Sequence, residues 1–249
     1  MSGLQHPGSR SFELVADLYE RARPEYPKEA VAWVADRLGL GTESTILDLG
    51  AGTGKLTRAL VETGARVIAV EPGDAMRAEL ERALPDVEAL RGAAEDLPLP
   101  DRSVDCVAVG QAFHWFRQEE AMPELHRVLR QEGGLALLWN SRDQEAPLQR
   151  EISDLIASFV PPGRPGPDRW ARALEESTLF TQLEETHFPF VQELDADALA
   201  ARIGSISFVA ASPLERRREL DARLRAVVER QGGRVEFPYV TDVYVSRAV

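Results

Sequence analysis

The sequence predicts an α/β fold in which helices cover both faces of a mostly parallel sheet. Short apolar segments alternate with helical segments from residue 45 to residue 139, which is typical of βαβ units. A glycine-rich turn follows the first apolar segment, at residues 50–54. The chain of 249 residues is 44% hydrophobic, so it can bury a sizeable core as one domain with an added cap or as two closely merged domains.

Two helical segments precede this alternation. Apolar positions recur at helical spacing over residues 12–23, where Pro24 stops the helix, and over residues 30–38, where Gly39 ends it. Residues 1–11 are polar and are expected to form a loose tail rather than a secretion signal.

The alternating region and the segment after it are expected to contain different elements. The expected strands of the alternating region cover residues 45–49, 66–70, 87–90, 104–109 and 135–139. Its expected helices cover residues 55–62, 74–84 and 119–130. After Asn140 the sequence predicts helices over 147–160, 197–204 and 213–230, strands over 185–194 and 234–245, and a Pro- and Gly-rich loop at 161–167.

Charge and composition narrow the range of partners. The net charge of −12 disfavours binding to nucleic acid or anionic lipid, because like charges repel, and no segment is long and apolar enough to span a bilayer. The single cysteine, Cys106, lies in an apolar segment and cannot form an internal disulfide, which indicates a reducing, cytoplasmic location. The four histidines and Cys106 show no metal-site spacing, and the sequence carries no signal of oligomeric state.

The glycine-rich turn is the strongest chemical signal. A Walker-type phosphate loop requires Ser or Thr after the lysine, whereas Leu56 follows Lys55. A dinucleotide fingerprint requires Gly-x-Gly-x-x-Gly, whereas the spacing here is Gly-x-Gly-x-Gly. Asp48, two places before the first glycine, would repel a pyrophosphate and attract a cation. The turn therefore favours a nucleoside ligand that carries positive charge.

Glu71 supplies a second signal, because it closes the second expected strand. A carboxylate at this position can accept hydrogen bonds from both hydroxyls of a ribose. Since it follows the glycine turn by one βα unit, we favour ribose binding over an ordinary surface carboxylate at a turn.

These residues resemble those of the class I S-adenosylmethionine-dependent methyltransferases, in particular the small-molecule, type 11 branch. The motifs that carry the resemblance are residues 47–54, Glu71, residues 92–101 as an adenine loop, and residues 103–109 as a fourth strand. The resemblance implies a Rossmann-like, seven-stranded, mostly parallel sheet with an antiparallel last strand and a helical cap. It also implies S-adenosylmethionine as the cofactor and a small molecule as the methyl acceptor.

The resemblance further implies three parts of the chain. These are an N-terminal helical lid over residues 1–43, a cofactor-binding core over 44–140, and cap helices with the last two strands of the same sheet over 141–249.

Most of the implied cofactor residues follow the carboxyl ends of the strands. Gly50 and Gly52 would pass the methionine portion, while Asp48 would order that loop or meet the amino group. Glu71 would hold the ribose, and Gln111 would line the methionine end.

The adenine end is implied less directly. Met76 would pack against adenine, or it is an ordinary core residue of a helix. Glu95 would reach the adenine amino group with the Ala94 backbone beside it, and Asp96 is a rival for that role.

Two further segments complete the candidate site. Residues 111–116, Gln-Ala-Phe-His-Trp-Phe, follow the fourth strand, and in this fold that position faces the transferred methyl group. His114 is a candidate general base, with loop positioning as the alternative. The leader at residues 19–27 resembles one seen in the same branch, where Tyr19 would close over the cofactor and Arg23 would pair with its carboxylate, unless Arg23 is a surface residue at a helix end.

Two other functions remain open at this point. A non-catalytic module that binds the cofactor and engages a protein partner is an alternative, because no unambiguous base is visible. A nicotinamide-dependent oxidoreductase is a second, suggested by the glycine turn and Glu71 but disfavoured by the glycine spacing and Asp48.

Overall fold

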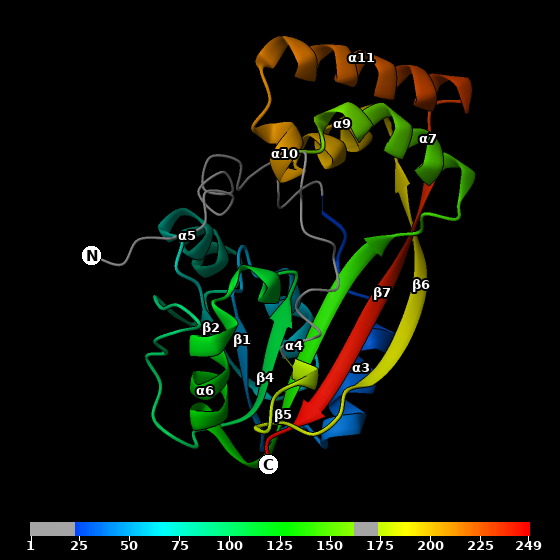
Figure 1. The fold of residues 1–249 in the computed structure, drawn as a ribbon. Coiled ribbons are helices and arrows are strands. Elements are labelled where there is room, and N and C mark those ends of the chain that lie inside the picture. The colour runs from blue at the N-terminus through cyan, green and yellow to red at the C-terminus, as the bar shows by residue number, and fades with distance from the viewer. Residues whose placement is uncertain (1–22, 162–173) are drawn as a thin grey trace. The chain divides into compact units, whose positions relative to one another are not determined.

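A computed structural model describes residues 23–161 and 174–249 of the chain (Figure 1). The helix expected over residues 12–23 therefore lies outside the described residues, apart from its last position. The chain divides into two compact units. Among the described residues, the sheet unit comprises 25–140, 174–188 and 241–249, and the helical unit comprises 23–24, 141–161 and 189–240.

The strands form a sheet in the order β3-β2-β1-β4-β5-β7-β6. Its parallel strands are β1 (Thr45–Leu49), β2 (Arg66–Val70), β3 (Glu88–Leu90), β4 (Val104–Gly110) and β5 (Leu129–Arg142). The strand order reverses direction at β1, since β2 lies on one side of it and β4 on the other. Open α/β sheets bind ligands at such a switch point, beyond the carboxyl ends of the strands.

The two remaining strands are β6 (Glu184–Leu194) and β7 (Val235–Arg247). The last strand runs antiparallel to its neighbours: the Ala248 N–H donates to the Gly133 carbonyl at one end of the β5–β7 pair, and the Asp143 N–H donates to the Pro238 carbonyl at the other. The predicted α/β fold class, with a mostly parallel seven-stranded sheet and an antiparallel last strand, is confirmed.

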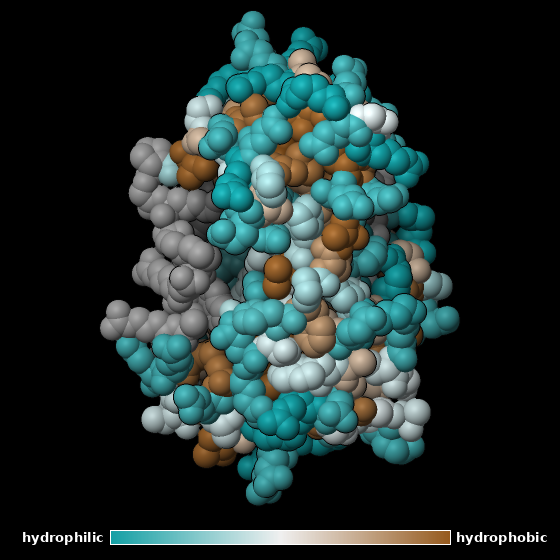
Figure 2. Space-filling model, turned by 90° about the vertical axis from the view of Figure 1, so that its right-hand side faces the viewer, coloured by the Kyte–Doolittle hydropathy of each residue, from teal (hydrophilic) through white to brown (hydrophobic). Residues whose placement is uncertain are grey.

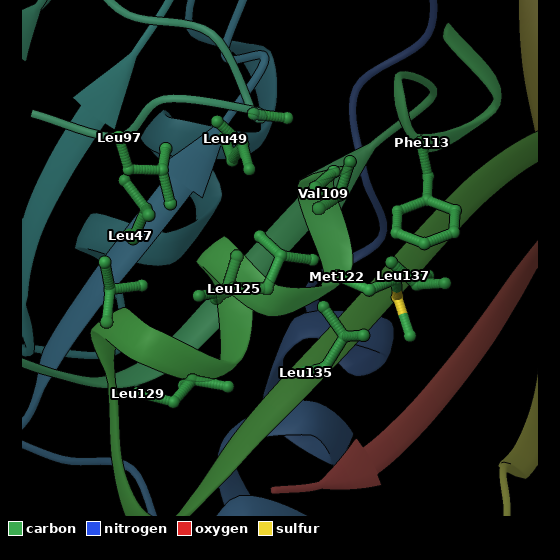
Figure 3. Packing of buried hydrophobic residues seen from close by; sticks show 14 of the residues in the cluster. Leu47, Leu49, Leu97, Val109, Phe113, Met122, Leu125, Leu129, Leu135 and Leu137 are labelled. Carbon is green, nitrogen blue, oxygen red and sulfur yellow. The ribbon is translucent and has the colours of Figure 1, made fainter. Parts of the chain in front are cut away.

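Helices cover both faces of the sheet unit. Alternate residues of a strand point to opposite faces, so central strands that are covered on both sides are apolar throughout. Helix α6 (Gln118–Val128) packs on one face, where Leu47, Val109 and Leu135 meet Leu125 (Figure 3). The other face packs against α3 (Lys28–Leu38) and α4 (Lys55–Val61) through Ile46, Cys106, Ala108, Ala136 and Leu138. Helix α3, expected within an N-terminal lid, thus packs in the sheet unit.

Cys106 is fully buried between these layers. Burial raises the pKa of its thiol, because the thiolate would lose its hydration. The side chain therefore acts as a small apolar residue, as its sequence surroundings predict.

The helical unit has a core of its own. It contains α7 (Pro147–Ile156), α9 (Ala196–Gly204), α10 (Ser207–Ala210) and α11 (Leu214–Arg230), together with the ends of strands that extend from the sheet unit. Ile152, Leu199 and Leu224 from the helices pack with Phe237 and Tyr239 of β7. This segment folds around its own apolar cluster, so it is more than a loop inserted between strands.

Polar side chains dominate the molecular surface in the view of Figure 2. Among the described helices, none has the length and apolar character needed to cross a membrane. Within residues 23–161 and 174–249, the side chains of His, Cys, Asp and Glu do not gather into a group able to hold a metal ion.

Candidate functional site

The glycine turn leaves the carboxyl end of β1 in a backbone conformation that suits glycine. Gly50, Gly52 and Gly54 have φ angles of +71°, +58° and +91°. The Gly50 N–H donates to the Val70 carbonyl at 2.8 Å, which ties the turn to the end of β2. A Cβ on Gly50 would lie 2.7 Å from that of Ala112. Both the φ angle and this close approach therefore strongly disfavour a side chain at this position.

Glu71 joins the turn to the start of the next helix, α5 (Asp74–Ala83). One carboxylate oxygen accepts the Gly52 N–H at 2.9 Å, and the other accepts the Gly73 N–H at 2.8 Å. Hydrogen bonds to an ionised acceptor are short and strong, so Glu71 fixes the shape of the turn. The structure thus brings Glu71 and the glycine turn, the two principal signals of the sequence, together at one edge of the sheet.

Asp48 lies beneath the same turn and is fully buried. Its Oδ2 accepts a hydrogen bond from Thr57 Oγ1 at 2.5 Å, whereas its buried Oδ1 has no hydrogen-bond partner among the described residues. Burial raises the pKa of Asp48 to about 7, the Thr57 hydrogen bond opposes this, and the charge of Glu71 adds to it. A buried acceptor that is costly to ionise and incompletely bonded is suited to receive a cation.

Met76 of α5 lies beside the turn, since its Sδ is 3.7 Å from the place where a Cβ on Gly52 would stand. Met76 is itself buried. A flexible, polarizable thioether at this place suits contact with a flat ring, and it also serves the packing of α5.

The aromatic segment comes against the other side of the turn. Phe116 lies 3.7 Å from the position of a Cβ on Gly50, and Ala112 is closer still. Gln111 adopts a left-handed φ of +59°, and its Nε2 donates to the Asn140 carbonyl at 3.0 Å. A non-glycine residue in this region is strained, and such residues are frequent at ligand sites.

His114 lies in the short helix η1 (Phe113–Trp115), where its ring is 4.6 Å from the Trp115 ring. The His114 side chain is exposed, whereas Phe113 is fully buried. Burial of Phe113 anchors the segment, so that the other aromatic residues and His114 stand at the edge of the sheet.

The expected adenine loop reaches this segment. Glu95 Oε1 accepts the Arg117 N–H at 2.7 Å, directly before α6 begins. Ala94 is buried, and the Asp96 side chain is exposed. Glu95 therefore connects the loop to Arg117, the residue directly after the aromatic segment.

The leader divides between the two units. Tyr19 lies outside the described residues. Arg23 belongs to the helical unit, where its Nη2 donates to the Ser205 carbonyl at 3.4 Å. In the sheet unit, Glu25 Oε1 accepts hydrogen bonds from Lys55 Nζ at 2.9 Å and Arg58 Nη1 at 3.1 Å.

Comparison with known proteins decides the family. A family model described as a methyltransferase domain matches residues 47–137. An uncharacterized methyltransferase of Mycobacterium tuberculosis is 41% identical over 241 residues, which cover 94% of this chain and 93% of that protein. The chain belongs to the methyltransferase family. An uncharacterized methyltransferase of Schizosaccharomyces pombe is 35% identical over 249 residues, which cover 96% of this methyltransferase and 98% of the relative.

Solved structures agree with this assignment. The methyltransferase superposes on a protein assigned as a type II methyltransferase from Anaeromyxobacter dehalogenans with a TM-score of 0.67 at 28% identity, covering 91% of this chain and 97% of the other. It superposes on a protein assigned as a methyltransferase of an antibiotic biosynthesis pathway from Anabaena variabilis with a TM-score of 0.63 at 25% identity, covering 90% and 98%. The family predicted from the sequence is therefore confirmed.

Sequence reasoning missed two residues of this methyltransferase's candidate site. Thr57 binds Asp48 from the first turns of α4, and Asn140 holds Gln111 through its carbonyl and donates its Nδ2 to the Glu25 carbonyl at 3.2 Å. Thr57 lies beside Leu56 and before Leu60 on the buried side of the helix. A polar residue on an apolar helix face, nine positions after Asp48, is the signal that could have identified it.

A substitution in the turn tests how tightly the site is packed. Gly50→Ala is expected to lower the free energy of unfolding by about 2–3 kcal/mol. Alanine is strained at the left-handed φ of this position, and its Cβ would lie too close to that of Ala112. Gly41→Ala is the matched control, since a Cβ there meets nothing within 4 Å and its φ is not positive. Urea unfolding of the two variants measures the difference; equal losses of stability would contradict the packing described for the turn.

Proposed function

We propose that this methyltransferase binds S-adenosylmethionine at the glycine turn of the sheet unit and transfers its methyl group to a small-molecule acceptor. The observation that carries the proposal is Asp48, a fully buried carboxyl group under a turn whose glycines admit close backbone contact, with one oxygen that no residue of 23–161 or 174–249 hydrogen-bonds. A ligand with a cationic amino group satisfies that oxygen, whereas a phosphate does not.

The residues around the turn fit the parts of this cofactor. Asp48 would receive the amino group, and Glu71 would accept the ribose hydroxyls at the end of β2. Gly50 and Gly52 would pass the methionine portion, whose far side Gln111 would line. At the other end of the site, Met76 lies beside Gly52 and would contact adenine, while Glu95 and the Ala94 backbone would meet the adenine amino group.

The cofactor supplies an activated methyl group on a cationic sulfur, and the protein supplies alignment and, when needed, a base. Phe116, Trp115 and the strained Gln111 would fix the methionine end relative to the turn. The faces of aromatic rings are electron-rich and stabilise a nearby cation. We assign His114 the role of proton acceptor for acceptors that lose a proton, because its exposed imidazole stands on the same segment.

The transfer itself tests the proposal. Incubation with methyl-labelled S-adenosylmethionine and a panel of small acids, phenols and amines is expected to label at least one acceptor and to release the demethylated cofactor in equal amount. If the folded protein binds the cofactor but labels no member of a broad panel, the small-molecule acceptor is wrong and the module that engages a protein partner takes its place.

A variant separates the two roles of His114. With a phenol or amine acceptor, His114→Gln is expected to lower kcat about 100-fold and to remove the acidic limb of the pH–rate profile, as loss of a general base does. Cofactor affinity should stay within twofold of the native value. An unchanged pH profile with a small loss of kcat would show that His114 only positions the segment.

A further inference from the structure

Two arginine side chains lie beside one tyrosine inside the helical unit. Arg202 of α9 is 4% exposed, and its Nε donates to Tyr239 Oη at 2.6 Å. Arg142 ends β5, the neighbour of β7 in the sheet, and the Asp143 N–H donates to the Pro238 carbonyl. That hydrogen bond places Arg142 across from Tyr239 on the adjacent strand.

Each of the two guanidinium groups is incompletely bonded. Arg142 Nη2 donates to Ser153 Oγ at 3.2 Å, but the Nη1 atoms of both Arg142 and Arg202 are buried and have no hydrogen-bond partner in the described part of the chain. Neither arginine forms an ion pair with a carboxylate of residues 23–161 or 174–249. Other arginines of the unit do, as Arg225 shows with Asp197 and Asp221.

Two uncompensated cations in one apolar core are unfavourable. Burial lowers the pKa of Arg142 to about 10, and the positive charge of Arg202 lowers it further, against an opposing effect of Tyr239. Buried charges in proteins are normally paired, because an isolated ion loses its hydration without compensation. An anion bound beside the two guanidinium groups would supply the missing opposite charge.

The surroundings indicate an organic anion. The Tyr239 ring stacks on Phe190 with centroids 5.2 Å apart, and Phe237 packs on it at the same distance. Gln149 is fully buried beside them: its Nε2 donates to the Pro238 carbonyl at 2.8 Å, while its Oε1 has no partner among the described residues. The aromatic rings beside the arginines, with two donors and one acceptor that no described residue hydrogen-bonds, match a small molecule with a charged oxygen group and a hydrocarbon part.

We propose that Arg142, Arg202 and Tyr239 form a binding site for the oxyanion of an organic acid, a carboxylate or a phosphate ester. Guanidinium groups bind both in a two-pronged manner. With a net charge of −12, the chain repels anions in general, so binding requires a dedicated cationic site.

Thermal unfolding with small probes tests the site without the cofactor. At constant ionic strength, benzoate or inorganic phosphate is expected to raise the unfolding temperature saturably, and uncharged benzamide is not. A response to benzoate alone identifies a carboxylate ligand, and a response to phosphate alone identifies a phosphate ester. No response to either anion overturns the proposal.

Matched variants connect the response to the two arginines. Arg142→Gln and Arg202→Gln are each expected to weaken anion binding at least tenfold, while Arg218→Gln, at an exposed position of α11, leaves it unchanged. A response that survives in the Arg142→Gln and Arg202→Gln double variant contradicts the site. Tyr239→Phe keeps both charges and should weaken binding less.

Two further readouts keep the test decisive. Without ligand, the Arg142→Gln variant is expected to unfold at the same temperature as the native protein or at a higher one, because it removes a buried charge without an opposite charge beside it. Replacement of an arginine with a merely structural role would lower the unfolding temperature. Cofactor affinity, measured by calorimetry, should stay within twofold of native in all variants. Cofactor binding without an anion response defeats this inference alone, and an anion response without cofactor binding defeats the proposed function and leaves the anion site standing.

Discussion

Glu71→Ala is expected to weaken S-adenosylmethionine binding about 100-fold or more. The variant loses the proposed hydrogen bonds to the ribose, each about 1.5–3 kcal/mol for a charged acceptor, and it releases the Gly52 and Gly73 amides that the carboxylate holds. Isothermal calorimetry with the purified variant measures the loss.

Glu88→Ala is the control for this variant. Glu88 is an exposed glutamate on the neighbouring strand β3 and pairs with Arg66 at the surface. Its replacement should leave cofactor affinity within twofold of native. If Glu71→Ala, still folded by circular dichroism, binds as tightly as Glu88→Ala, then Glu71 does not hold the cofactor.

Asp48→Asn is expected to stabilise the protein and to impair cofactor binding at the same time. The pKa of Asp48 is raised from 3.8 to about 7, so between these values the folded state holds the proton more tightly than the unfolded state. The contribution of Asp48 to stability is therefore lost as pH rises from about 4 to about 7, at about 1.4 kcal/mol per pH unit and about 4 kcal/mol in all. Asparagine does not titrate, so the free energy of unfolding of the variant should exceed that of the native protein increasingly over this range and level off above pH 7.

Urea unfolding at pH 5, 6, 7 and 8 measures this difference, with Asp36→Asn as an exposed control on α3 that should follow the native curve. Cofactor affinity should fall at least tenfold in Asp48→Asn, because the amino group loses a charged acceptor. In the native protein, affinity should rise with pH through about 7 as Asp48 ionises, and this rise should be absent in the variant. A variant that is less stable than native at pH 8 would contradict the burial-driven pKa shift.

Local signals were sufficient for much of the fold and for placing the central residues of the candidate site at one sheet edge. The strands 45–49 and 66–70 were predicted with the bounds that the structure gives. Short apolar segments that contain β-branched residues and lie between turns are a clear signal for buried strands. Asp48 and Glu71 follow from position alone, since the ends of adjacent parallel strands meet at one edge.

Where the prediction failed, distant contacts decide the structure. Strand β5 was expected over 135–139 but spans Leu129–Arg142, because Gly134 does not break it: the glycine gives room for Leu38 of α3 to pack against the strand. Helix α10 is four residues long and was missed, since one turn carries no periodic pattern. The arginine pair at Tyr239 joins three separated segments, and no local motif marks it.

Calorimetric titration of S-adenosylmethionine into the native protein is the decisive test of cofactor binding at the glycine turn. We expect saturable binding of one cofactor per chain, with similar binding of its demethylated product, and loss of both in Asp48→Ala and Glu71→Ala but not in Glu88→Ala. A folded native protein that binds neither ligand would contradict the assignment of the glycine turn, and with it the proposed function.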